Sequence, residues 1–402
     1  MKPGTSPLRL ALAGMIGLAV AMGIGRFVFT PILPGMMASL GLSPSAAGLI
    51  ASANYLGYLI GAILAVGGWA QGRERAIMLA AILASAALAA VMGLTDSVAL
   101  FLVIRFLAGV ASAFVLVFLT TIVVARLASA GREGLTAIHF GGVGVGIAAS
   151  SLMVGLLALA DGDWREGWYW AGALSLAGAI AAALLVGRVG GIAGGSEREP
   201  PLPKSAALTR IILAYGMFGF GYIVTATFLV AIVRQADGGD LFEAAVWLVT
   251  GLAGIPSVWL WNRLARPIGL VRAYAIACMV EAAGVLASVL LPVPAGPLIG
   301  GALLGGTFIA ITALGLAAGR RRAGASPRRA LAWMTAAFGL GQIIGPVVAG
   351  YLADWTGDFF VASVTAALVL VAAAWIAFGA RSMPVIAVSQ PARPTSGPDH
   401  AV

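Results

Sequence analysis

Twelve apolar segments divide the chain, and they constrain its fold more than any other feature of the sequence. They cover approximately residues 9–34, 45–68, 75–94, 98–125, 135–159, 167–188, 209–233, 243–262, 272–291, 295–318, 329–353 and 358–379. Each is long enough to cross a hydrocarbon core of about 30 Å as a helix. Since 61% of the residues are hydrophobic and 10% are charged, against about 25% charged in soluble proteins, most of the chain must lie in lipid. The sequence predicts an all-α membrane protein with twelve transmembrane helices.

The distribution of charge sets the expected orientation of these helices. Of the 24 Lys and Arg residues, 20 fall in connections on the side of the N-terminus, and Arg165 and Arg234 fall on the other side. By the positive-inside rule, both termini are cytoplasmic, and we expect a bacterial inner-membrane protein. The net charge of +9 is therefore a topology signal, and we expect no nucleic-acid partner. Arg26 and Arg105 remain inside apolar segments.

A polar, proline-containing stretch separates the sixth and seventh segments and reads as a cytoplasmic linker. We expect an N-terminal six-helix half at 1–190, the linker at 191–208, and a C-terminal half at 209–402 with a short disordered tail from about 383.

The two halves share a weak internal repeat, which is the sequence mark of many transporters. A shift of about 196 residues places 22–26 on 218–222 and Gly109 on Gly305. Since each pair keeps the same direction across the membrane, the halves are expected to be parallel repeats about an axis along the membrane normal. This arrangement favours alternating access around a central site.

Twelve spans arranged as six plus six resemble the major facilitator superfamily. Two motifs support this resemblance: Arg105–Gly109 has the form Arg-x-x-x-Gly, and Gly345–Gly350 holds a Gly-Pro element. More narrowly, the chain resembles the bacterial YbfB/YjiJ-type branch. The segments that carry this narrower resemblance are Gly23–Pro34, Tyr215–Tyr222, Gly305–Phe308 and Ala336–Pro346. The resemblance implies a major facilitator fold in which the first, fourth, seventh and tenth helices line the cavity.

The loop after the second segment resembles the superfamily's gate motif. It keeps Gly72, Arg73 and Arg75 but lacks the motif's Asp. The resemblance therefore implies a gating loop without its usual charge lock.

Arg26 and Arg105 are the candidates for anion binding. An arginine costs roughly 2.5 to 3.5 kcal/mol in the middle of a membrane helix, so such a residue is expected to face protein or a water-filled cavity. No acid lies inside a span of the same half to balance them, and a guanidinium binds a carboxylate or phosphate bidentately. The alternative is that each arginine bonds helix carbonyls, Thr30, Asn54 or Tyr58 and braces the helices.

Aromatic and polar side chains complete the candidate site. On the seventh segment Tyr215, Phe218, Tyr222 and Thr225 fall within about 80° of arc, and Tyr222 occupies the repeat position of Arg26. This stripe would suit an organic anion with a hydrophobic body, although such stripes also serve as packing. The candidate substrate-binding residues are Arg26, Thr30, Asn54, Tyr58, Arg105, Tyr215, Phe218, Tyr222 and Gln342. For Asn54, Tyr58 and Gln342, interhelix hydrogen bonding is the alternative.

Two residues are candidates for coupling. Glu281 is the one acid well inside a segment, on a ninth helix that is peripheral in the superfamily, and His139 lies near the cytoplasmic end of the fifth segment. A membrane carboxylate can carry protons, whereas a helix-end hydrogen bond is the alternative for His139. A proton or a counter-anion is the candidate coupling partner.

Together these features predict a secondary active transporter for a small organic, anionic solute. The alternative is a multidrug or metabolite efflux pump of the same superfamily. A non-transporting receptor would be expected to carry a larger soluble module, and an enzyme would need clustered acid, base or metal ligands. We expect no enzymatic activity, no cofactor and no metal, and a monomer surrounded by the lipid bilayer.

Overall fold

A computed structural model describes residues 6–66, 68–186 and 199–380, and the regular structure of these residues is helical. It contains twelve candidate membrane spans, as predicted. Residues 187–198 and 381–402 lie outside the described ranges. The expected tail from 383, the first part of the expected linker at 191–208, and the domain boundaries therefore stay predictions.

The first six spans come from the following helices. They are α1 (Pro7–Leu18), η1 (Ala19–Ile24) and α2 (Phe29–Leu40) in the first span, then α3 (Pro44–Ala65), α4 (Glu74–Met92), α5 (Val98–Ser129), α6 (Thr136–Leu159) and α7 (Trp164–Val186). Short 3-10 turns η2 (Gly68–Ala70) and η3 (Glu133–Leu135) precede α4 and α6.

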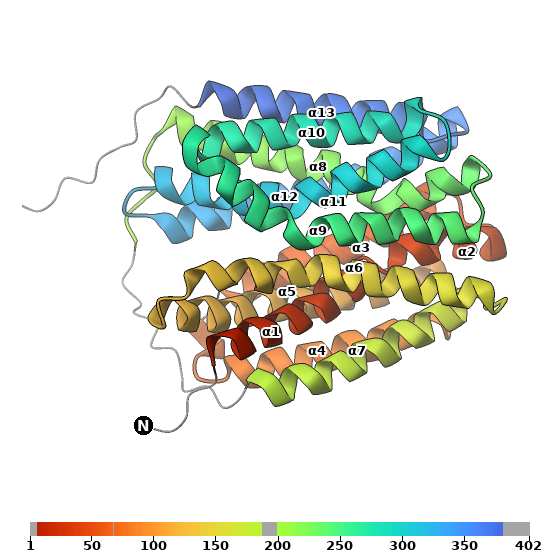
Figure 1. The fold of residues 1–402 in the computed structure, drawn as a ribbon, viewed down its shortest axis with the longest axis horizontal. Helices are drawn as coiled ribbons and strands as arrows, with labels where there is room; N and C mark the ends of the chain where they lie inside the picture. Colours follow the sequence, from red (N-terminus) through yellow and green to blue (C-terminus); the bar gives the residue numbers. More distant parts are fainter. Residues whose placement is uncertain (1–5, 67, 187–198, 381–402) are drawn as a thin grey trace, which may run out of the picture.

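The last six spans are single long helices. They are α8 (Ala206–Gln235), α9 (Asp240–Ile268), α10 (Leu270–Leu290), α11 (Ala295–Arg322), α12 (Pro327–Thr356) and α13 (Phe360–Gly379). The two sets of six pack side by side along their lengths, and they meet where α6 contacts α9, α3 contacts α12 and α2 contacts α8 (Figure 1).

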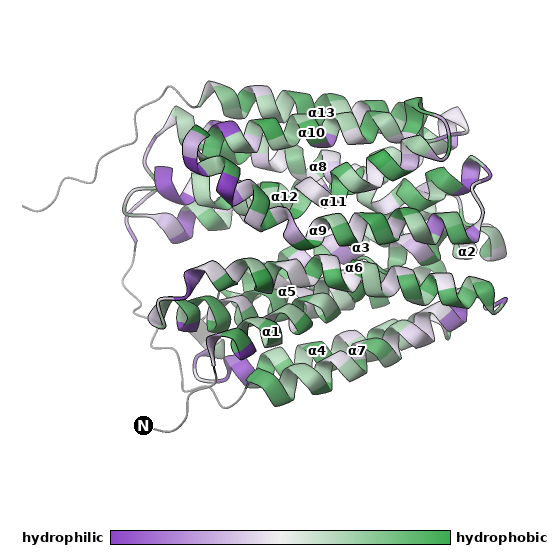
Figure 2. Ribbon diagram, viewed as in Figure 1, coloured by the Kyte–Doolittle hydropathy of each residue, from purple (hydrophilic) through white to green (hydrophobic). Residues whose placement is uncertain are grey.

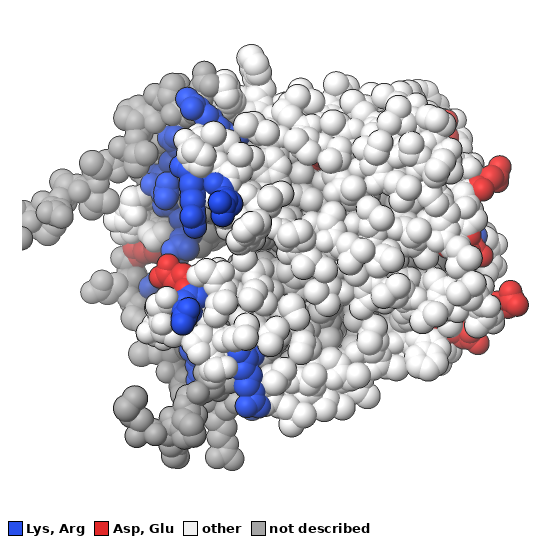
Figure 3. All heavy atoms as spheres, viewed as in Figure 1, with Lys and Arg blue, Asp and Glu red and all other residues white. Residues whose placement is uncertain are grey.

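The ends of the bundle differ in charge. Hydrophobic residues cover the middle of the helices, and hydrophilic residues gather at both ends (Figure 2). On the face shown in Figure 3, Lys and Arg gather at one end and Asp and Glu predominate at the other. We name them the basic end, which holds Arg328 and Arg329 at the start of α12, and the acidic end, which holds Asp354 near its close.

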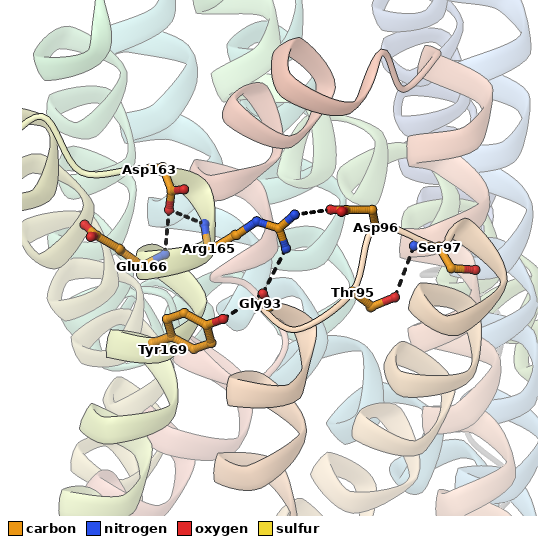
Figure 4. A network of polar contacts seen from close by, with 8 residues as sticks. All are labelled: Gly93, Thr95, Asp96, Ser97, Asp163, Arg165, Glu166 and Tyr169. Carbon is orange, nitrogen blue, oxygen red and sulfur yellow. Dashed lines mark hydrogen bonds and ion pairs between the residues drawn. The ribbon is translucent and has the colours of Figure 1, made fainter.

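The two arginines at the acidic end are both paired with carboxylates. Arg165 donates to the Gly93 carbonyl over 3.0 Å and forms an ion pair with Asp96, which ties the start of α7 to the α4–α5 connection (Figure 4). Arg234 bonds Asp240 and Glu243, which ties α8 to α9. These two cations therefore clamp neighbouring helices within each half.

Among the hydrogen bonds between described residues, five join the two halves, and these lie between the middle of the bundle and the acidic end. They are Thr30 to the Ala226 carbonyl, the Ser45 amide to Asp354, Ser52 to the Ile343 carbonyl, Tyr55 with Thr227, and Ser151 to the Ala244 carbonyl. The structure thus holds the halves together at the acidic end.

Glycines let helices of opposite halves approach backbone to backbone. A Cβ built on Gly144 of α6 would lie 2.6 Å from the Gly251 oxygen and 2.6 Å from the Ile255 nitrogen of α9. A Cβ on Gly48 of α3 would likewise clash with the Pro346 carbonyl of α12. Neither site can hold a larger residue unless the two backbones separate.

Candidate substrate site

The first span is interrupted at the position of Arg26. The sequence predicts an apolar span over 9–34, but the structure has a π-helix from Ala19 to Ile24, a turn over 25–28, and a new helix from Phe29. In the π-helical part the Gly25 amide donates to the Val20 carbonyl over 2.7 Å. Pro31 and Pro34 follow the break, and because proline has no amide hydrogen, neither can continue the helical hydrogen-bond ladder.

Arg105 of α5 bonds the backbone that this interruption exposes. Its Nη1 donates to the Gly25 carbonyl over 3.0 Å, and its Nη2 donates to the Arg26 carbonyl over 2.9 Å. The Asn54 amide in turn donates to the Arg105 carbonyl over 2.9 Å. Backbone carbonyls inside a membrane need such internal partners, so these contacts favour the bracing interpretation for Arg105 and Asn54.

Arg26 has a different environment. It is 2% exposed, and its guanidinium carbon lies 4.6 Å from the ring centres of both Tyr55 and Tyr58 and 5.5 Å from that of Phe27. Its Nε and Nη2 have no hydrogen-bond partner within the described residues. A buried charged donor without an acceptor raises the free energy of the folded protein. The described residues supply no acceptor for these two nitrogens.

Aromatic rings of the C-terminal half form a wall that faces the first span. Tyr222 of α8 lies nearly parallel to Phe308 of α11 and Phe338 of α12, with ring centres 5.8 Å and 5.7 Å away. Phe218 stacks on Tyr222 at 4.9 Å, and Tyr215 stacks on Phe338 at 4.9 Å.

This aromatic wall comes close to Arg26. The Tyr222 hydroxyl accepts a hydrogen bond from Gln342. Phe27, next to Arg26, packs edge-on against Phe308 at 5.7 Å. The structure therefore brings together Arg26, Thr30, Tyr58, Tyr222 and Gln342 around the junction of the two halves.

Phe308 and Phe338 belong to this wall but are absent from the candidate residues chosen by sequence. Both lie inside the segments that carry the family resemblance, Gly305–Phe308 and Ala336–Pro346. Phenylalanine is too common in membrane spans to single out a site without its neighbours, so the contact with Tyr222 was needed to find them.

The other sequence candidates lie away from Arg26. His139 is buried near the start of α6, where its Nε2 bonds the Thr120 hydroxyl over 3.0 Å, as expected for a structural contact. In the gating loop Gly72 has a φ of +76°, Arg73 donates to the Trp69 carbonyl over 3.1 Å, and Arg75 donates to the Ala183 carbonyl of α7 over 3.3 Å. These arginines bind backbone within their own half.

Glu281 of α10 is fully buried. Neither carboxylate oxygen has a hydrogen-bond partner by distance and angle within the described residues. Thr307 is a close neighbour of the carboxylate, and its hydroxyl donates to the Leu303 carbonyl over 2.6 Å. Thr307 directly precedes Phe308, whose ring stacks on Tyr222.

Comparison with solved structures defines the class of protein. The nucleoside transporter NupG, as a D323A mutant, matches 92% of this chain and 100% of its own with a TM-score of 0.72 at 13% identity. A bacterial homologue of the human lysosomal transporter Spinster, in an inward-facing and occupied conformation, matches 94% and 97% with a TM-score of 0.66 at 16% identity. The fold is therefore that of the major facilitator transporters.

The family follows from the sequence. Residues 18–378 match the family described as the uncharacterised MFS-type transporter YbfB, and the chain belongs to it. A chloramphenicol resistance protein of Streptomyces lividans is 30% identical over 266 residues, which are 62% of this chain. The match spans 65% of that relative, slightly less than two thirds of its length. The chain is thus an integral membrane protein of a transporter family.

Proposed function

We propose that this protein is a secondary active transporter that moves a small organic anion across the bacterial inner membrane by alternating access. The observation that carries the proposal is Arg26, a buried cation with two N–H groups that have no acceptor in the described structure. A carboxylate would accept both in the bidentate geometry that guanidinium favours.

The surroundings of Arg26 favour an anion with an apolar body. Tyr222, Phe308 and Phe338 offer nearly parallel rings on the opposite side of the junction, and binding sites for small molecules combine such apolar walls with few polar groups. Arg26 supplies the charge, Tyr58 and Tyr222 supply hydroxyls, and Gln342 orients the Tyr222 hydroxyl.

The orientation and the coupling belong to the same proposal. With the basic end in the cytoplasm, the hydrogen bonds between the halves lie toward the periplasmic side, and the opening to the cytoplasm requires a further movement of the halves because Arg26 is buried here. Glu281 is the proposed proton carrier, because its carboxylate is buried and has no hydrogen-bond partner among the described residues. His139 is the weaker candidate, since its ring already bonds Thr120.

Uptake by proteoliposomes tests the anion site. A panel of labelled aliphatic and aromatic carboxylates is compared for the wild type, Arg26→Gln, Arg26→Lys and the control Arg272→Gln, which changes an exposed arginine of α10. We expect Arg26→Gln to abolish saturable uptake, Arg26→Lys to retain part of it, and the control to match the wild type. Wild-type rate and affinity for every substrate of the Arg26→Gln protein would refute the anion site.

A second candidate function is efflux of amphipathic compounds. It is favoured by the similarity to the chloramphenicol resistance protein and by the aromatic wall. Cells that express the wild type, Tyr222→Ala or no transporter are compared for chloramphenicol tolerance. Higher tolerance that depends on both the wild-type protein and Tyr222 would favour efflux.

A further inference from the structure

A cavity lies at the basic end, between α6 of one half and α9 of the other, and Arg26 does not line it. Its volume is about 280 Å³. The lining residues that matter for its chemistry are Glu133 and Thr136 from the N-terminal half and Trp259, Asn262, Arg263 and Arg266 from the C-terminal half.

The cavity exists because α6 and α9 separate beyond a tight crossing. At the crossing, Cβ atoms built on Gly144 and Gly141 would lie 2.6 Å and 3.0 Å from the backbone of α9, at Ile255 in both cases. One turn closer to the basic end, at Ala137 of α6 and Trp259 of α9, the two helices line the cavity instead of packing backbone to backbone.

Two uncompensated cations lie in this cavity. Arg263 and Arg266 are exposed, and neither forms an ion pair with Glu133 or any other carboxylate in the described part of the chain. The Arg263 guanidinium lies 5.9 Å from the centre of the Trp259 ring. Tryptophan and basic residues at the end of a span are typical of the level of the lipid headgroups.

One face of α9 continues from these cations into the membrane. Leu252, Ile255 and Trp259 are spaced by three and four residues and are 52%, 37% and 55% exposed, and Arg263 and Arg266 extend the same spacing. Residues at this spacing share a helix face, so an apolar stripe leads directly to the two arginines.

We propose that this cavity binds the phosphate headgroup of an anionic phospholipid, with an acyl chain along the apolar stripe of α9. Arg263 and Arg266 bind the phosphate, and Asn262 and Thr136 offer further hydrogen bonds to the headgroup. Because both halves line the cavity, a bound lipid stabilises the arrangement in which the acidic end is closed. The site is independent of the transported solute.

Lipid titration of the purified full-length protein tests this site by native mass spectrometry. Dioleoylphosphatidylglycerol and dioleoylphosphatidylcholine are compared for the wild type, the double variant Arg263→Gln with Arg266→Gln, and the control Arg272→Gln. A basic residue near a membrane surface contributes about 1 kcal/mol, or about fivefold each. We therefore expect the double variant to lose about tenfold or more in affinity for phosphatidylglycerol, with the control unchanged.

Two further measurements locate the ligand. Phosphatidylglycerol should raise the melting temperature of the wild type and not that of the double variant, which folds normally because both side chains are exposed. Glycerophosphoglycerol, the soluble deacylated headgroup, should bind far more weakly than the lipid. Equal phosphatidylglycerol binding by wild type and double variant would overturn the site, and equally tight binding of the soluble headgroup would overturn its assignment to lipid.

Discussion

The Thr30 hydroxyl donates a hydrogen bond of 2.6 Å to the Ala226 carbonyl, and these residues are 196 positions apart, the spacing of the internal repeat. Equivalent positions of two halves related by a pseudo-two-fold axis can touch only near that axis. Arg26 and Tyr222, four residues earlier in each half, therefore flank the same axis. A cation and a phenol occupy equivalent positions, so the centre of the transporter is chemically asymmetric.

Arg105 and Arg26 should differ in what they contribute to stability. Replacing Arg105 with Gln removes two hydrogen bonds from a charged donor, each worth about 1.5–3 kcal/mol, and leaves the Gly25 and Arg26 carbonyls exposed in the membrane. We expect a clearly lower melting temperature in detergent for Arg105→Gln. Arg26→Gln should melt close to the wild type, and the reverse order would contradict the bracing role of Arg105.

Gly144 should be needed for the halves to close. An Ala methyl at this position would meet the Gly251 oxygen at 2.6 Å, below the closest approach that real Cβ atoms show. We expect Gly144→Ala to reduce transport by about tenfold or more, as a misplacement of about 1 Å can reduce turnover about a hundredfold. Gly306→Ala is the matched control, because a Cβ there meets nothing within 4 Å. Equal uptake by the two variants would contradict this prediction.

A disulfide across the acidic end should lock the halves together. The Ser45 amide donates to the Asp354 carboxylate over 3.2 Å, so cysteines at these two positions are close in the closed arrangement. In a Cys278→Ala background, oxidation of Ser45→Cys with Asp354→Cys should stop transport, and reduction should restore it. After proteolysis of the connection between the halves, a gel shows whether the disulfide still joins the two fragments. A bond that forms without inhibition would show that this contact does not open during transport.

Glu281→Gln should separate coupling from solute movement. The amide keeps the size of the side chain and removes its ability to carry a proton. Within the described residues neither carboxylate oxygen has a hydrogen-bond partner that the change would remove. We expect uptake driven by a pH gradient to fall strongly while solute counterflow persists. Ser85→Ala is the control, since Ser85 occupies the repeat-equivalent position and is also buried, with no hydrogen-bond partner in the described part of the chain. Loss of both activities in Glu281→Gln would argue for a structural role.

The number of spans and the intramembrane arginines could be predicted from the sequence because both depend on local composition. Apolar segments of sufficient length form helices in lipid whatever their neighbours are. The cost of a buried charge likewise identifies Arg26 and Arg105 as residues with a special environment. These arguments need no knowledge of which helices touch.

The interruption of the first span could not be predicted in the same way. Gly25, Pro31 and Pro34 weaken the helix locally, but a proline kink is as consistent with them as a π-helix and a turn. The outcome depends on Arg105, which is 79 residues from Arg26 and satisfies the exposed carbonyls. For the same reason, the different roles of the two arginines emerged only from their contacts.

At the interruption of the first span, structure and binding depend on different chemical groups. Main-chain carbonyls and Arg105 hold the shape of the break, while the Arg26 side chain makes none of these bonds and is the proposed contact for the solute. A different residue at 26 would leave that scaffold intact and change the polarity of the cavity. Cargo preference in such a chain can therefore diverge through one position, without requiring the architecture to be rebuilt.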